Sequence, residues 1–82
     1  MTDKIIQIIG EVLKTEVNAD TSQATCEKWD SLQHLNIIVA LEVVFNLSFE
    51  PEEIAEMKSV KEIEKYIDKY KSTTDEQNRR LY

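Results

Sequence analysis

Hydrophobic residues recur with the spacing of amphipathic helices in four places along this chain. Between residues 4 and 17 they stand at positions 5, 8, 9, 12 and 13, which lie on one face of a helix. A second apolar run covers residues 31–46, a short helix opens at Pro51, and a last helix follows Ser59. Residues 18–30 have no such period and are rich in turn formers, so we predict a long loop there.

The pattern predicts an all-α fold, a small four-helix bundle with three longer helices and one short third helix. The third helix spans about two turns, and Ile54 and Met57 are its expected inward residues. The fourth helix has an apolar stripe of Val60, Ile63, Tyr66, Ile67 and Tyr70. Residues 72–82 are polar and aperiodic, so we assign residues 1–71 to the domain and residues 72–82 to a flexible polar tail.

The helix over residues 31–46 has more apolar residues than one buried stripe requires. Ile38, Leu41 and Phe45 form the natural inward stripe, with Ile37 and Val44 beside it. The residues left to point outward are Leu32, Leu35 or Val39, and Val43. Exposed apolar residues in a row tend to mark a contact surface. The alternative is a central helix that its neighbours cover on both sides.

Composition narrows the class of protein. With 82 residues the chain forms one domain, and its net charge of -6 argues against nucleic acid as a partner. The acidity suits partners that have basic docking patches, and the alternative is that it only keeps a small protein soluble. The single cysteine, Cys26, cannot form an intrachain disulfide, and no apolar run is long enough to span a bilayer. Because the first residues also lack the features of a signal peptide, we expect a cytoplasmic monomer without a membrane partner.

Ser31 stands at the start of the apolar helix. Asp30 and Gln33 are three residues apart, as in a capping box, and if Asp30 is the cap, the hydroxyl of Ser31 is free. Backbone N–H groups and the helix dipole would then stabilise a phosphate ester at that position. A serine at a helix start is more often itself a cap, and that alternative stays open.

The motif Asp30-Ser31-Leu32 is followed by an ordered set of landmarks. These are Ala40-Leu41-Glu42, Phe45, Leu47 and Phe49, Pro51-Glu52-Glu53 and Ser59-Val60. Together they resemble the acyl carrier protein family, also called phosphopantetheine-binding carriers, over nearly the whole folded region. The resemblance implies a carrier that catalyses nothing by itself.

The resemblance also implies a cofactor and partners. A phosphopantetheinyl transferase would attach 4'-phosphopantetheine from coenzyme A covalently to Ser31, within the motif that Asp30 and Leu32 complete. The thiol of the arm would hold an acyl or aminoacyl thioester. The helix over residues 31–46 would be the docking surface for the transferase, for an acyl-loading ligase or transferase, and for downstream biosynthetic enzymes.

The chain departs from the carriers of fatty acid synthesis, whose second helix usually has several acids. Here Glu42 is the only acid on that helix. The run from Trp29 to Leu35 is more similar to stand-alone carriers of dedicated biosynthetic clusters. An aminoacyl or D-alanyl carrier of the same fold is one alternative, and a helical adaptor that is not modified at Ser31 is another.

Other candidate residues favour structural roles. We interpret His34 as a packing residue with a satisfied ring, although it could also lie near the phosphate of the arm. Trp29 is expected to anchor the loop to the core rather than flank the arm. Cys26 and His34 lack the further groups of a nucleophilic enzyme, and one histidine with one cysteine is too few for a metal site. We therefore predict no catalytic and no metal-binding residue.

Overall fold

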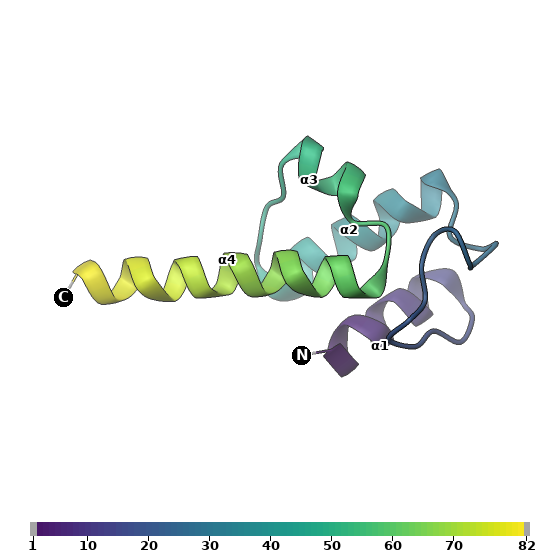
Figure 1. The fold of residues 1–82 in the computed structure, drawn as a ribbon, viewed down its shortest axis with the longest axis horizontal. Coiled ribbons are helices and arrows are strands. Elements are labelled where there is room, and N and C mark those ends of the chain that lie inside the picture. Colours follow the sequence, from purple (N-terminus) through teal and green to yellow (C-terminus); the bar gives the residue numbers. More distant parts are fainter. Residues whose placement is uncertain (1, 82) are drawn as a thin grey trace.

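Four helices account for the regular structure of residues 2–81. The computed structural model describes the backbone of residues 2–81 and the side chains of residues 2–71. The helices are α1 (Thr2–Leu13), α2 (Ser31–Phe45), α3 (Pro51–Glu56) and α4 (Val60–Leu81), and α1 contacts both α2 and α4 (Figure 1). The predicted all-α bundle with a short third helix and a long loop after the first helix is confirmed.

The core lies where one face of each long helix meets the others. Helix α1 contributes Ile5, Ile8, Ile9 and Leu13, α2 contributes Ile37, Ile38 and Leu41, and α4 contributes Val60, Ile63 and Ile67. Trp29, Phe49 and Met57 complete the core from the connecting segments. The apolar periods read from the sequence therefore coincide with the buried faces, because burial of these stripes is the main force that holds the helices together.

Helix α1 ends at Leu13, earlier than the predicted end at residue 17. Lys14 has a left-handed backbone with φ 56°, and the amide of Thr15 donates to the carbonyl of Gly10 at 3.3 Å. This six-residue closure is a Schellman motif, which ends a helix and reverses the chain. A Cβ on Gly10 would lie 3.3 Å from the carbonyl oxygen of Thr15, so glycine leaves room for the reversal. The reversal lets Val17 pack against the core from the loop.

The long loop is attached to the junction between α3 and α4. Gln23 donates its amide to the carbonyl of Lys58 at 2.7 Å, and the amide of Val60 donates to the carbonyl of Thr21 at 3.0 Å. These bonds flank an isolated antiparallel bridge between Ser22 and Ser59. The loop is therefore fixed at its middle by backbone hydrogen bonds, and its last residues run into the start of α2 in a defined direction.

Helix α4 continues beyond the domain that the sequence predicted. We expected a frayed polar tail after Lys71, and the backbone is helical to Leu81. The segment 72–81 has neither glycine nor proline, so a helix already nucleated at Val60 can propagate through it. The division into a domain of residues 1–71 and a flexible tail of residues 72–82 stays a prediction, and Tyr82 lies outside the described residues.

Candidate functional site

The start of α2 leaves the hydroxyl of Ser31 free. Asp30 is the N-cap, with an extended backbone, and its carboxylate accepts a hydrogen bond from the amide of Gln33 at 2.8 Å. Ser31 is the first helical residue and is exposed, and among the described residues no group bonds its Oγ. The alternative that Ser31 is itself the cap is therefore wrong. Gln33 does not complete the capping box, because its side-chain oxygen accepts from Asn36.

The first turn of α2 offers backbone donors next to that hydroxyl. Asp30 occupies the amide of Gln33 through its side chain and the amide of His34 through its carbonyl. Within the described residues no protein group accepts from the amides of Ser31 and Leu32. These two N–H groups lie at the positive end of the helix dipole, where a phosphate group is stabilised. The position thus fits a phosphodiester carried on Ser31.

Trp29 and His34 join the loop to α2 directly below the site. The Trp29 side chain is buried, and its Nε1–H donates to His34 Nδ1 at 3.0 Å, with the two rings 6.1 Å apart between centroids. Because Nδ1 accepts, the proton of the neutral ring is on Nε2, which donates to the carbonyl of Ile54 in α3 at 2.8 Å. The predicted loop anchor and the predicted satisfied histidine ring are both confirmed.

Sequence reasoning missed that these two residues bond each other. Trp29 precedes the N-cap and His34 is the fourth helical residue, which are the two positions of a hydrophobic staple. That spacing is the signal that could have revealed the contact. The partner on α3 is a backbone carbonyl, for which the sequence has no signal.

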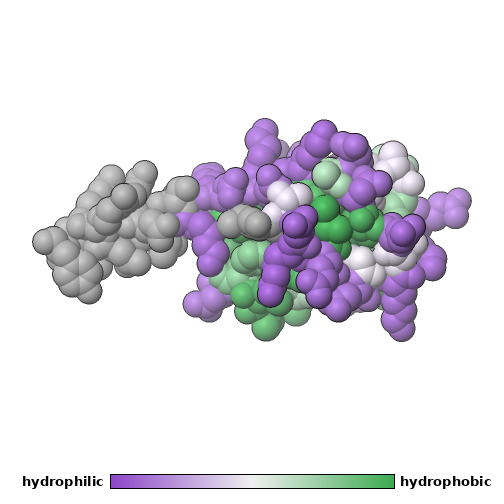
Figure 2. Space-filling view, turned by 90° about the horizontal axis from the view of Figure 1, so that it is seen from below, coloured by the Kyte–Doolittle hydropathy of each residue, from purple (hydrophilic) through white to green (hydrophobic). Residues whose placement is uncertain are grey.

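The outward face of α2 is apolar, as predicted. Leu32 is 69% exposed, Leu35 55%, Val39 59% and Val43 75%, and we call these four residues the α2 row. In the view from below, Figure 2 shows apolar surface exposed between the polar side chains of the described residues. The alternative of a helix covered on both sides is therefore wrong for the described residues. Val44, which we placed beside the inward stripe, is also 47% exposed.

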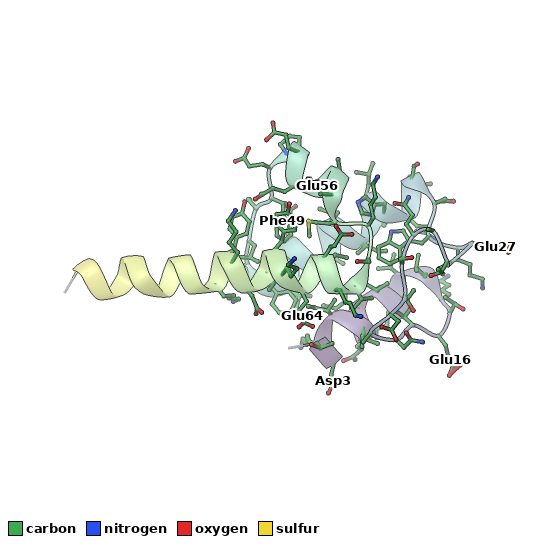
Figure 3. The ribbon with its side chains drawn as sticks, in the orientation of Figure 1. Asp3, Glu16, Glu27, Phe49, Glu56 and Glu64 are labelled. Carbon is green, nitrogen blue, oxygen red and sulfur yellow. The ribbon has the colours of Figure 1, made fainter. Side chains whose placement is uncertain are left out.

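The α2 row carries no charge. Glu42 is the only acid of the helix, and its carboxylate is turned to the following connector, where it accepts from the amide of Phe49 at 2.8 Å. Acids on other elements, such as Asp3, Glu16 and Glu27, point away from the core at the edge of the molecule (Figure 3). Most acids of the chain therefore lie on other elements, and the α2 row itself is neutral, while the exposed carboxylate of Asp30 stands next to Ser31.

Polar bonds attach α3 to α4. Tyr66 donates its hydroxyl to Glu56 at 2.5 Å, and Tyr70 donates to Glu53. The hydrogen bond to Glu56 raises the pKa of Tyr66 to about 12, and that to Glu53 raises the pKa of Tyr70 to about 12. The bond from Tyr70 lowers the pKa of Glu53. None of the α3 residues is fully buried, so these bonds and the contact with His34 carry much of its attachment.

The described residues show no sign of a metal centre or a membrane span. No group of three or more histidine, cysteine or acidic side chains gathers to hold an ion. No described helix combines the length and the apolarity that crossing a bilayer requires. Cys26 is a half-buried free thiol.

Comparisons with known proteins agree with this geometry. The family model described as "Phosphopantetheine attachment site" matches residues 3–67. The acyl carrier proteins of Rickettsia massiliae and Rickettsia felis are each 32% identical over 73 residues, which covers 80% of this chain and 85% of theirs. The solution structure of the holo acyl carrier protein from Geobacter metallireducens superposes with a TM-score of 0.79 at 29% identity, and covers 92% of this chain and 90% of that one.

These matches define a class of small helical carriers rather than a class of enzymes. The chain belongs to the family of acyl carrier proteins, which carry acyl groups on a covalently attached 4'-phosphopantetheine arm. Its partners are, in general terms, a phosphopantetheinyl transferase and biosynthetic enzymes.

Proposed function

We propose that Ser31 is the residue that carries the phosphopantetheine arm. The observation that carries the proposal is its free, exposed hydroxyl at the first position of α2, beside two amides without a protein partner. When bound, the arm supplies the thiol on which acyl groups are held as thioesters. The role of this chain is to present the hydroxyl for modification and then to hold the phosphodiester.

Different residues around Ser31 would present the hydroxyl and hold the phosphodiester. Asp30 ends the loop and fixes the direction of the first turn, since its carboxylate is bonded to the amide of Gln33. The amides of Ser31 and Leu32 would donate to the phosphate oxygens. The exposed side chain of Leu32 lies next to the hydroxyl, where an approaching transferase would cover it.

Intact-protein mass spectrometry tests the assignment. The apo protein is incubated with coenzyme A and a promiscuous phosphopantetheinyl transferase, and we expect a single gain of the phosphopantetheine mass. Ser31→Ala should abolish the gain, and Ser48→Ala, at another exposed serine, should leave it unchanged. An unmodified wild-type protein, or a Ser31→Ala variant that still gains the mass, would refute the assignment.

We propose further that the α2 row is the docking surface for the transferase and for the loading and downstream enzymes. The row is apolar, starts beside Ser31 and is free of charge over the described helix. A carrier must leave each partner after the reaction, so a modest apolar patch suits weak and fast binding. The same neutrality favours the stand-alone carriers over those that dock through an acidic second helix.

The cargo is proposed at the level of a class. We infer an acyl or hydroxyacyl unit, and an aminoacyl or D-alanyl unit is the second candidate of the same fold. Loading assays that offer the holo protein to acyl and to aminoacyl ligases separate the two. We also propose a cytoplasmic location, because coenzyme A is the donor of the arm. The monomeric state stays a prediction.

A further inference from the structure

The side chain of His34 connects the start of α2, where Ser31 lies, to the loop and to α3. His34 is buried, and each of its ring nitrogens has a partner: the indole N–H of Trp29 at 3.0 Å and the carbonyl of Ile54 at 2.8 Å. Trp29 belongs to the loop, His34 to α2 and Ile54 to α3. In the described residues no buried side-chain polar atom is left without a partner, so this chain of bonds is complete.

The bond between His34 and Trp29 lies next to the junction that carries the hydroxyl. Trp29, Asp30 and Ser31 are consecutive, and the Trp29 side chain is only 2% exposed. The direction in which the loop enters α2 is therefore set by how the indole is held inside the core. Among the described residues only His34 accepts from the indole N–H, and a buried donor without a partner is strongly disfavoured.

We propose that His34 is a positioning residue for the attachment reaction at Ser31. Its Nδ1 holds the indole of Trp29 and thereby holds the loop–helix junction in the one geometry that presents the hydroxyl to the transferase. A hydroxyl that is held near its reactive position loses less freedom when the transferase binds it. The inference rests on Ser31 being the attachment residue.

Two substitutions separate the two bonds of His34. His34→Asn keeps an oxygen acceptor at the δ position, facing Trp29, and loses the group that reaches Ile54. His34→Gln keeps a donor at the ε position, facing Ile54, and loses the δ acceptor. Glutamine is also the better helix former, so stability alone would favour His34→Gln over His34→Asn.

The experiment measures kcat/KM for the apo carrier with a promiscuous phosphopantetheinyl transferase, together with unfolding in urea. We expect His34→Gln to lower kcat/KM about five- to tenfold, the size of a lost hydrogen bond, and His34→Asn to stay within about twofold of wild type. The KM for coenzyme A should not change in either variant. His34→Asn would then react faster than His34→Gln, although glutamine has the higher helix propensity.

A third variant keeps the test decisive if one histidine variant does not fold. Trp29→Phe removes the indole N–H and leaves the bond from His34 to Ile54, so it should lower kcat/KM to a similar degree. The double variant Trp29→Phe/His34→Gln should be no slower than the slower single variant, because each substitution removes the same hydrogen bond, the one between Trp29 and His34. Equal rates for His34→Asn and His34→Gln, or a wild-type rate for Trp29→Phe, would overturn the inference.

The control at Ser31 separates this inference from the proposed function. If Ser31→Ala still gains the phosphopantetheine mass, the assignment of the site fails, whatever the His34 variants do. If Ser31→Ala is inert and His34→Gln reacts at the wild-type rate, the site stands and only the positioning role of His34 is refuted.

Discussion

The α2 row makes a quantitative prediction about docking. Val43 is 75% exposed, so a partner that covers the row would bury most of this side chain. Val43→Ala deletes two carbon atoms from the contact. At about 0.8 kcal/mol for each buried carbon, scaled by the exposed fraction, the loss of binding free energy is about 1 kcal/mol. That loss corresponds to a roughly fivefold fall in kcat/KM for the carrier.

Val44 supplies a matched control on the same helix. It is also exposed, at 47%, but it points about 100° around the helix from Val43 and so lies off the row. The assay compares kcat/KM of a promiscuous phosphopantetheinyl transferase for wild type, Val43→Ala and Val44→Ala. Unfolding in urea should change by less than about 0.5 kcal/mol in both variants, because both side chains face solvent.

Equal rates of modification for the variants and wild type would refute the docking surface. If Val43→Ala and Val44→Ala are modified as fast as wild type, the row takes no part in binding the transferase. If both are slowed equally, the contact is not confined to the row. Val39→Ala repeats the test one turn away from Val43 and should give a fall of similar size.

The remaining predictions concern the attachment of the connectors and the core. Glu42→Gln should lower the free energy of unfolding by about 1 kcal/mol, measured in urea, since the bond to the amide of Phe49 loses its charge. Ile63→Ala, at a fully buried position of α4, should cost about 2–5 kcal/mol in the same assay. The pKa of Glu53 is lowered from its ordinary value of 4.5 by the bond from Tyr70, so its stabilising effect is present above pH 4.5 and is lost as the pH falls through the lowered value. The difference in unfolding free energy between wild type and Tyr70→Phe should therefore shrink on acidification, and a constant difference from pH 6 to pH 3 would contradict it.

The neutral row is the part of the site that the sequence predicted best. The excess of apolar residues over one buried stripe was visible before any contact was known, because a helix of period 3.6 can bury only part of its circumference. The spacing of Asp30 and Gln33 indicated Asp30 as a possible cap, and the structure decided for Asp30 over Ser31. The apolar excess and the candidate cap depend on residues within one or two helical turns, so local rules suffice to indicate them.

The sequence also indicated the family, because the motif at Ser31 and the later landmarks stand in order along nearly the whole fold.

The sequence did not indicate where α1 ends. The period continues to Val17, but the helix stops at Leu13 because the chain reverses there and brings Val17 onto the core. The end of a helix without a glycine or proline stop signal is decided by such packing.

The contacts between distant segments were decided by the tertiary structure alone. The carbonyl of Ile54 became the partner of His34, and the carboxylate of Glu42 turned to the amide of Phe49 and left the row without charge. Backbone groups have no residue-specific signal, and which of them meets a given side chain depends on how whole helices pack. The sequence by itself predicted four helices and their apolar faces, while only the packed fold decided that Asp30 and not Ser31 is the cap, and how the loop and α3 are held around the free hydroxyl.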